Sequence, residues 1–182
     1  MHIEDVIAPE LCVLGAQATS RKKALQFIAT LFADHNSQYE PFLLLKALVA
    51  REQMGTTAIG NGVALPHGRV GSCEEPLAVF VTLAEPIDFD APDQEPVDIV
   101  FALIVPKQFD FQQLNGLDGL IEILKDKKVC AQIRHAHNNQ ALYEIIESAI
   151  AQHEKAQGLE RVNSERTNNE KSKEKKEIED NA

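Results

Sequence analysis

Hydrophobic residues in the first fifty positions recur with the spacing of amphipathic helices. One stripe follows Ser20, a residue type that caps helix N-termini, and another follows Pro41, which is favoured in the first turn of a helix. The two stripes consist of Ala24, Leu25, Phe27, Ile28, Leu31 and Phe32, and of Phe42, Leu44, Leu45, Leu48 and Val49. We therefore expect two helices at the start of the chain.

The period then changes to that of strands. Four short β-branched or apolar runs are bounded by Gly, Pro and Asp, which is typical of strands, at residues 57–59, 63–65, 77–83 and 97–105. Helical spacing returns at residues 114–124, 127–135 and 142–149. Helices, then strands, then helices predict an α/β fold, a single domain with a central mixed β-sheet flanked by helices.

The composition changes from about Ala151 onward. Residues 151–182 hold seven Lys and Arg against eight Asp and Glu, and their only large apolar residues are Leu159, Val162 and Ile178. So few apolar residues cannot form a core. We therefore expect one domain over residues 1–150 and a charged low-complexity tail over residues 151–182, disordered or loosely helical. The alternative is a dedicated docking segment.

Charge and cysteine usage narrow the classes of function. The 28 acidic and 18 basic residues give a formal net charge of −10, which repels nucleic acid and anionic lipid. We therefore expect no nucleic-acid partner and no membrane insertion. The three cysteines, Cys12, Cys73 and Cys130, show no paired spacing, and the N-terminus lacks the basic segment of a signal peptide. These features predict a cytoplasmic protein with reduced thiols.

A glycine-rich run presents a histidine at a constrained point of the chain. The expected strand 63–65 ends at Pro66, His67 and Gly68, where proline fixes the backbone and glycine leaves room beside the imidazole. An ordinary histidine pKa of about 6.5 leaves much of the ring neutral, with a lone pair for nucleophilic attack. His67 is therefore a candidate nucleophile. The alternative is a turn histidine that donates to a backbone carbonyl.

Residues 51–68 carry a resemblance to a known family. They read Arg-Glu-Gln-Met-Gly-Thr-Thr-Ala-Ile-Gly-Asn-Gly-Val-Ala-Leu-Pro-His-Gly, which resembles the active-site signature of the type-2 enzyme IIA domains of the bacterial phosphoenolpyruvate-dependent phosphotransferase system. The similarity extends through residues 86–90, 96–98 and 101–106 and covers roughly residues 5–150. It is strongest to the nitrogen-regulatory branch, and it implies the mannitol/fructose-type fold.

The resemblance implies that His67 accepts a phosphoryl group from a phosphorylated histidine carrier protein and that Arg51 lies beside it. It implies no cofactor and no metal. Transfer between histidines needs in-line positioning and donors for the equatorial oxygens, and Arg51 offers a planar fork of donors. Further donors are the expected phosphate-cradling backbone N–H groups of Gly60, Asn61, Gly62 and Gly68. The alternatives are a solvated helix end for Arg51 and an ordinary tight turn for residues 60–62.

The sequence departs from the family pattern at one position. A second histidine commonly follows the strand that corresponds to residues 101–106, and the aligned residue here is Gln113. An amide cannot carry a positive charge, but it can donate to a phosphate or to the His67 ring. We therefore expect altered transfer rather than an inactive site. The alternative is an ordinary residue in the first turn of the next helix.

Other candidate sites have weaker patterns. Cys130, His135 and His137 do not share one helix face, which argues against a zinc site. Cys73 lies six residues beyond His67 in an expected loop, with nothing to orient a thiol nucleophile.

Asp88 and Asp90 could be paired carboxylates of a glycosidase. They flank Phe89 between prolines, however, where acids are usually solvated turn residues.

Two classes of function remain. The first is a phosphoryl acceptor and carrier with a mainly regulatory, nitrogen- or potassium-related role, whose partners are a histidine carrier protein and targets such as sensor kinases or transporters. A fructose/mannitol-type sugar-transport component is its near alternative. The second class is a binding module that has lost transfer, which the glutamine at position 113 keeps open.

Overall fold

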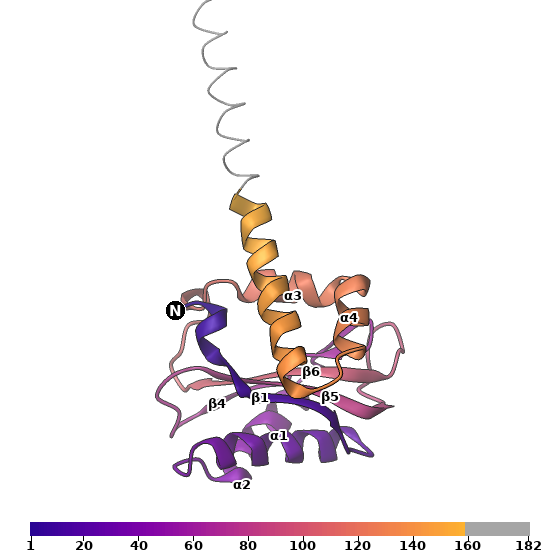
Figure 1. Ribbon diagram of the computed structural model, residues 1–182. Helices are drawn as coiled ribbons and strands as arrows, with labels where there is room; N and C mark the ends of the chain where they lie inside the picture. The colour runs from indigo at the N-terminus through magenta and orange to yellow at the C-terminus, as the bar shows by residue number, and fades with distance from the viewer. Residues whose placement is uncertain (159–182) are drawn as a thin grey trace, which may run out of the picture.

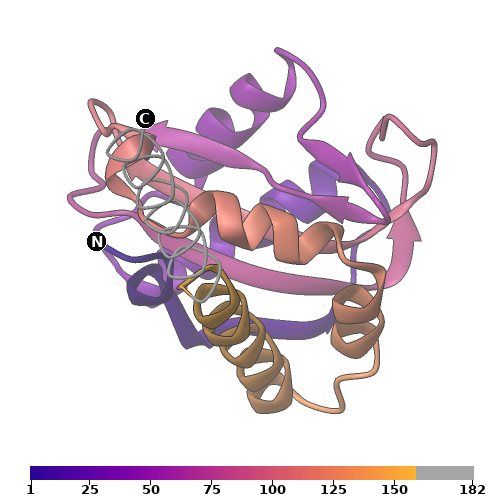
Figure 2. The same cartoon turned by 90° about the horizontal axis from the view of Figure 1, so that it is seen from above.

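The computed structural model describes residues 1–158 and has helices on both faces of one mixed sheet (Figure 1). Helices α1 (Arg21–His35) and α2 (Pro41–Glu52) cover one face. Helices α3 (Leu117–Lys125) and α4 (Lys127–Arg134) and a C-terminal helix over residues 139–158 cover the other, as the view from above also shows (Figure 2). This three-layer arrangement confirms the predicted α/β class.

The sheet contains six strands, in the order β1-β5-β6-β3-β2, with β4 also paired to β6. The strands are β1 (Ile7–Ala16), β2 (Ala58–Gly60), β3 (Val63–Ala64), β4 (His67–Val70), β5 (Leu77–Ile87) and β6 (Val97–Pro106). Strand β6 is antiparallel to β5 and parallel to both β3 and β4. The two short strands therefore occupy successive stretches of one edge of β6, with only two residues between them.

The two central strands are buried on both faces, which explains their nearly continuous apolar sequences. One set of alternating residues packs toward α1 and α2: Val79, Val81, Val100, Ala102 and Ile104. The other set packs toward α3, α4 and the C-terminal helix: Ala78, Phe80, Ile99, Phe101 and Leu103. The sheet thus separates two apolar cores and holds its edges, including the start of β4, in fixed positions.

The predicted helix starts at Ser20 and Pro41 are confirmed. The Ser20 hydroxyl accepts a hydrogen bond from the Lys23 N–H at 3.3 Å, and Pro41 is the first residue of α2. The four predicted strands are also present, with small shifts at their ends.

Two strands, β1 and β4, were not predicted. Strand β1 contains Pro9 and has a register shift between Ile7 and Cys12, so its apolar residues do not alternate regularly. It lies at the edge of the sheet, where proline is tolerated because one side of the strand has no ladder partner.

Two predicted element boundaries were wrong. His67 does not end a strand but begins β4, where it pairs with Leu103 of β6. Helix α3 begins at Leu117 rather than at residue 114, because Gly116, with φ of +87°, caps it in a left-handed conformation that favours glycine. Leu114 instead follows a short 3₁₀ turn, η2 (Phe111–Gln113).

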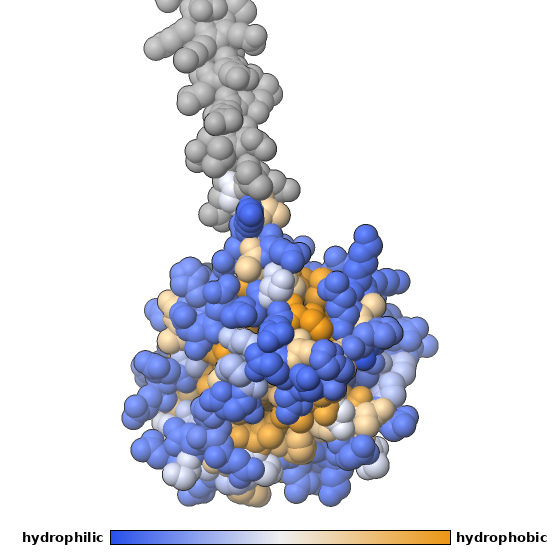
Figure 3. All heavy atoms as spheres, in the orientation of Figure 1, coloured by the Kyte–Doolittle hydropathy of each residue, from blue (hydrophilic) through white to orange (hydrophobic). Residues whose placement is uncertain are grey.

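The C-terminal helix continues through residue 158, so residues 151–158 of the expected tail are helical. The remainder of that tail, residues 159–182, lies outside the described residues. No helix within residues 1–158 has the length and apolar character needed to cross a bilayer. The face shown in Figure 3 is mostly hydrophilic, with hydrophobic residues gathered in smaller patches.

Candidate functional site

His67 lies where the chain crosses from β3 to β4 along the edge of β6. The Pro66 carbonyl accepts a hydrogen bond from the Leu103 N–H at 2.9 Å, and β4 then continues the parallel pairing. The backbone on both sides of the imidazole is therefore tied to the central strand. The ring itself is only partly buried, so it can be reached from outside.

The two ring nitrogens of His67 have different partners. Nδ1 lies 2.9 Å from the Leu65 carbonyl oxygen, and Nε2 lies 2.9 Å from Nε of Arg51. A carbonyl only accepts and a guanidinium only donates, so the hydrogen is on Nδ1 and the lone pair is on Nε2. His67 thus donates to a backbone carbonyl, as the turn alternative expected, and still keeps a nucleophilic nitrogen.

The surroundings of His67 favour its neutral form. Burial lowers the pKa of the ring below its ordinary value, and the positive charges of Arg51 and Arg69 act in the same direction. The Leu65 carbonyl and the negative charge of Glu52 oppose this shift without reversing it. The ring therefore keeps Nε2 unprotonated at neutral pH.

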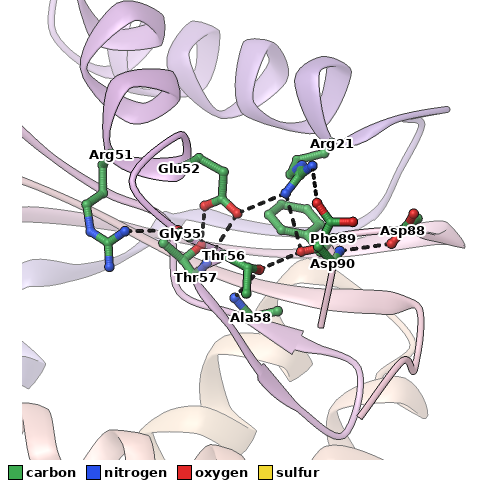
Figure 4. Close-up of polar contacts among 10 residues, drawn as sticks. All are labelled: Arg21, Arg51, Glu52, Gly55, Thr56, Thr57, Ala58, Asp88, Phe89 and Asp90. Atoms are coloured by element: carbon green, nitrogen blue, oxygen red, sulfur yellow. Dashed lines mark hydrogen bonds and ion pairs between the residues drawn. The ribbon is translucent and has the colours of Figure 1, made fainter. Parts of the chain in front are cut away.

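Arg51 is held at the end of α2 rather than left in solvent. Its Nη1 donates to the Gly55 carbonyl at 3.1 Å (Figure 4). Its Nε donates to His67 at the same time. Gly55 has φ of +144°, a backbone conformation that an L side chain rarely adopts. The turn after α2 thus folds back to bind the guanidinium, and the solvated helix-end alternative for Arg51 does not hold.

An aromatic residue that the sequence did not single out also contacts His67. The Phe111 ring meets the imidazole edge-on at 5.9 Å between centroids, and the Arg69 guanidinium lies 5.2 Å from the centroid of the same ring. Arg69 also donates to the carbonyls of Lys107 and Phe109. Arg69 follows His67 in β4 and Phe111 comes from η2, and no local motif marks either residue.

A small apolar cavity of about 220 Å³ lies beside the imidazole. Its walls come from β6, η2 and α3, and from Leu65: Leu65, Phe101, Leu103, Phe111, Leu117 and Ile121. One side of the His67 ring therefore faces an apolar surface.

Gln113 lies in the same 3₁₀ turn as Phe111, with an exposed side chain. Within residues 1–158, no hydrogen bond joins its amide to His67 or Arg51. The structure therefore brings the backbone segment of Gln113 close to the site, while Phe111 makes the contact. A role for Gln113 stays a prediction.

The expected phosphate cradle at residues 60–62 is not near His67. Val63 pairs with Ile99 and His67 with Leu103, four residues further along β6, which places the turn about 13 Å away at a rise of about 3.3 Å per residue. The Asn61 N–H already donates to the Asp93 carboxylate at 2.8 Å. Gly60 lies beside Asp93, and Gly62 lies beside Asp98 and the Arg134 guanidinium. A phosphate-binding role for Gly60, Asn61 and Gly62 stays a prediction that the position of this turn does not support.

Gly68 has a packing role that the sequence did not indicate. A Cβ at this position would lie 3.1 Å from Ala47 Cβ and 3.3 Å from the Leu48 backbone nitrogen. The missing side chain therefore lets β4 approach α2, the helix that carries Arg51. A phosphate contact from the Gly68 N–H stays a prediction.

The weaker candidate sites have structural partners instead. Burial raises the pKa of the Cys73 thiol, which donates to the Glu75 carbonyl, and the thiol is therefore a poor nucleophile. Asp90 pairs with Arg21 at 2.6 Å, and Asp88 accepts from the Asp90 N–H. Neither carboxylate is arranged for acid–base catalysis.

The three cysteines are unpaired and buried, as the predicted reduced state requires. Cys130 donates to the Leu124 carbonyl, and the His135 ring contacts the Ala131 carbonyl. Among residues 1–158 there is no group of three or more His, Cys, Asp and Glu side chains close enough to hold a metal.

Comparisons with known proteins agree with the resemblance. Residues 5–149 match the family model described as "Phosphoenolpyruvate-dependent sugar phosphotransferase system, EIIA 2". The chain is 36% identical over 146 residues to the nitrogen regulatory protein of Bradyrhizobium diazoefficiens, covering 80% of this chain and 95% of that protein. It is 37% identical over 147 residues to that of Escherichia coli K12, covering 80% and 90%.

A solved structure shows the same architecture. The crystal structure of nitrogen regulatory protein IIA-Ntr from Neisseria meningitidis matches with a TM-score of 0.73 and 28% identity, over 79% of this chain and 98% of that one. The family model and these relatives together support a phosphotransfer component with a regulatory role. The chain therefore belongs to the type-2 EIIA family of the phosphoenolpyruvate-dependent sugar phosphotransferase system and resembles its nitrogen regulatory members.

Proposed function

We propose that the protein accepts a phosphoryl group on Nε2 of His67 from a phosphorylated histidine carrier protein. The observation that carries this proposal is the division of roles between the two ring nitrogens. Nδ1–H is bound by the Leu65 carbonyl, so the lone pair is confined to Nε2, and Nε2 faces a fixed cation at 2.9 Å. The lowered pKa of His67 keeps that lone pair available at neutral pH.

The transfer step needs no group beyond the two proteins. The Nε2 lone pair of His67 attacks the phosphorus of the donor phosphohistidine, and a new N–P bond forms. The old N–P bond breaks in line with it, and its electron pair returns to the donor imidazole. The Leu65 carbonyl, still bound to Nδ1–H, stabilises the positive charge that develops on the His67 ring.

Arg51 has two successive tasks in this proposal. Before transfer its Nε–H occupies the Nε2 lone pair and keeps the ring in one orientation. When the donor approaches, the guanidinium must release Nε2, and its planar fork can then bind two phosphoryl oxygens. The Gly55 carbonyl, which binds Nη1, keeps the guanidinium within reach during that change.

The regulatory part of the proposal follows from charge. A phosphoryl group adds about −1.5 to −2 charges at one exposed point of the surface. A target protein such as a sensor kinase or a transporter can bind the two states with different affinity, and we propose that nitrogen or potassium status is signalled in this way. The family membership and the nitrogen regulatory relatives support this reading.

Intact mass measurement tests the function. The purified protein is incubated with phosphoenolpyruvate, enzyme I and a cognate carrier, and we expect one acid-labile phosphoryl addition that His67→Ala abolishes. No addition in the presence of a phosphorylated carrier would contradict the proposal and leave a binding module. Onward transfer to a fructose- or mannitol-type IIB would instead favour the sugar-transport alternative.

A further inference from the structure

A buried carboxylate lies next to Arg51 in the sequence and is not explained by the transfer step. Glu52, the last residue of α2, is only 8% exposed. Its carboxylate accepts hydrogen bonds from the Thr57 hydroxyl at 2.6 Å and the Thr57 N–H at 3.2 Å, and its Oε1 lies 3.4 Å from Nη1 of Arg21 (Figure 4). Burying a charged carboxylate costs free energy, and the contacts with Thr57 and Arg21 must offset that cost.

The contacts of Thr57 lead to one partner of His67. The Thr57 carbonyl accepts a hydrogen bond from the Leu65 N–H at 2.9 Å. The Leu65 carbonyl in turn accepts from Nδ1 of His67 at 2.9 Å. Glu52 is therefore connected through Thr57 to Leu65, and the Leu65 carbonyl sets the tautomer and orientation of the imidazole.

The Glu52 carboxylate also closes the turn that binds Arg51, the other hydrogen-bond partner of His67. Gly55, whose carbonyl binds Nη1 of Arg51 at 3.1 Å, lies in the turn between Glu52 and Thr57. The bonds from Glu52 to Thr57 hold the two ends of this turn together. The Glu52 side chain is thus connected to both hydrogen-bond partners of His67, the Arg51 guanidinium and the Leu65 carbonyl.

Phe89 and Asp90, in the loop after β5, contact Arg21 and Thr56. Arg21 pairs with Asp90 at 2.6 Å and donates to the Phe89 carbonyl. The Thr56 hydroxyl donates to the same carbonyl, as Figure 4 shows. Arg21 therefore gives the buried Glu52 a counter-charge and joins α1 to the turn.

We propose that Glu52, held by Thr57 and Arg21, is a positioning residue that sets the Arg51 guanidinium against the His67 imidazole for phosphoryl transfer. The proposal rests on the transfer function proposed above. An ionised carboxylate suits the task because all three of its partners are donors. A glutamine offers one acceptor oxygen, and its NH₂ would face a donor of Thr57 or Arg21.

Three variants and a control test the proposal. Glu52→Gln keeps the volume of the side chain and removes one acceptor. Thr57→Val removes the hydroxyl donor, whereas Thr57→Ser keeps it and should restore the wild-type behaviour. The control is Asp98→Asn, because Asp98 also pairs with an arginine, Arg134, at 2.7 Å and supports the turn at residues 60–62 away from His67.

The first measurement is single-turnover transfer from phosphorylated carrier over a range of carrier concentrations. Misplacement by about 1 Å can cost up to about 10²-fold in rate. We therefore expect Glu52→Gln and Thr57→Val to lower the maximal rate up to about 10²-fold, with little change in half-saturation. Thr57→Ser and Asp98→Asn should keep the wild-type rate. A folded Glu52→Gln with the wild-type rate would overturn the proposal.

The second measurement requires no phosphoryl transfer, so it separates this inference from the proposed function. ¹⁵N spectra of unphosphorylated protein at pH 8 report the Nε2 resonance of His67. In Glu52→Gln and Thr57→Val we expect it to move toward the position of a free acceptor nitrogen, because Arg51 no longer donates at a fixed distance. Unchanged resonances in both variants would overturn the inference even if the wild type is phosphorylated. A shift in both variants would support it even if the wild type takes up no phosphoryl group.

Discussion

The Nε of Arg51 lies 2.9 Å from Nε2 of His67, so the atom expected to attack phosphorus is already hydrogen-bonded to a cation. The bond orients the ring and occupies the lone pair until a donor arrives. Burial lowers the pKa of His67, and the positive charge of Arg51 adds to that shift. Transfer therefore requires the Arg51 guanidinium to release Nε2 and bind phosphoryl oxygens instead. The transfer rate should depend on this residue.

Arg51→Ala should slow transfer much more than it lowers stability. Loss of one preorganised donor to a transition state typically costs about 10²–10³-fold in rate. The side chain belongs to the last turn of α2 and is only partly buried, so little packing is lost. Single-turnover transfer and urea unfolding on the same protein check both parts. Loss of folding, or transfer at the wild-type rate, would show that Arg51 is structural or idle.

The pH dependence follows from the lowered pKa of His67. Because the folded protein binds this proton less readily than the unfolded chain, neutral His67 contributes stability above the ordinary pKa of about 6.5, and this contribution is lost as the pH falls through the folded value. The transfer rate should fall over the same acid range. In Arg51→Ala the pKa should rise, because a positive charge is removed, and an NMR titration of His67 measures both values. A lower pKa in the variant would contradict this account.

Gly68→Ala should destabilise the fold and disturb the site together. The added Cβ would lie 3.1 Å from Ala47 Cβ and 3.2 Å from the Ala47 carbonyl carbon, so α2 must move away from β4. Overpacking of this kind costs about 1–3 kcal/mol, measurable by urea unfolding. Since α2 carries Arg51, transfer should also slow. Wild-type stability of Gly68→Ala would contradict this prediction, because it would mean that α2 can move away from β4 without cost.

Gln113→His tests the position where the family resemblance expects a second histidine. A histidine can carry a positive charge near neutral pH, whereas the amide of Gln113 cannot. If the side chain can turn from its exposed position toward His67, the variant should show a changed transfer rate with a new pH dependence between about 6 and 7.5. Superimposable profiles of variant and wild type would show that position 113 does not reach the site.

Those features of the fold that depend on residues close to one another in the sequence could be predicted. Ser20 and Pro41 mark their helices through local capping and backbone geometry, and the apolar runs of β5 and β6 reflect burial on both faces. Strand β1 was not predicted because Pro9 and a register shift disrupt the alternation of its apolar residues. Its position at the edge of the sheet tolerates the proline.

The site was predictable only in part, because its contacts depend on pairing between distant segments. The run from Arg51 to His67 indicated both residues, but it also suggested a cradle at Asn61, which the pairing with β6 places elsewhere. Phe111 reaches His67 across the sheet edge from 44 positions away, and no local signal could reveal it. Glu52 was not singled out from the sequence, and its importance appears only because the fold buries it.

The most direct test of the central claim is the location of the phosphoryl group on the ring. Long-range ¹H–¹⁵N spectra of the phosphorylated protein distinguish the two nitrogens of His67. The account predicts phosphorylation at Nε2, with Nδ1 still protonated and donating to the Leu65 carbonyl, and no phosphorylation in His67→Ala. Phosphorylation at Nδ1, or a phosphoryl group that persists in His67→Ala, would contradict it.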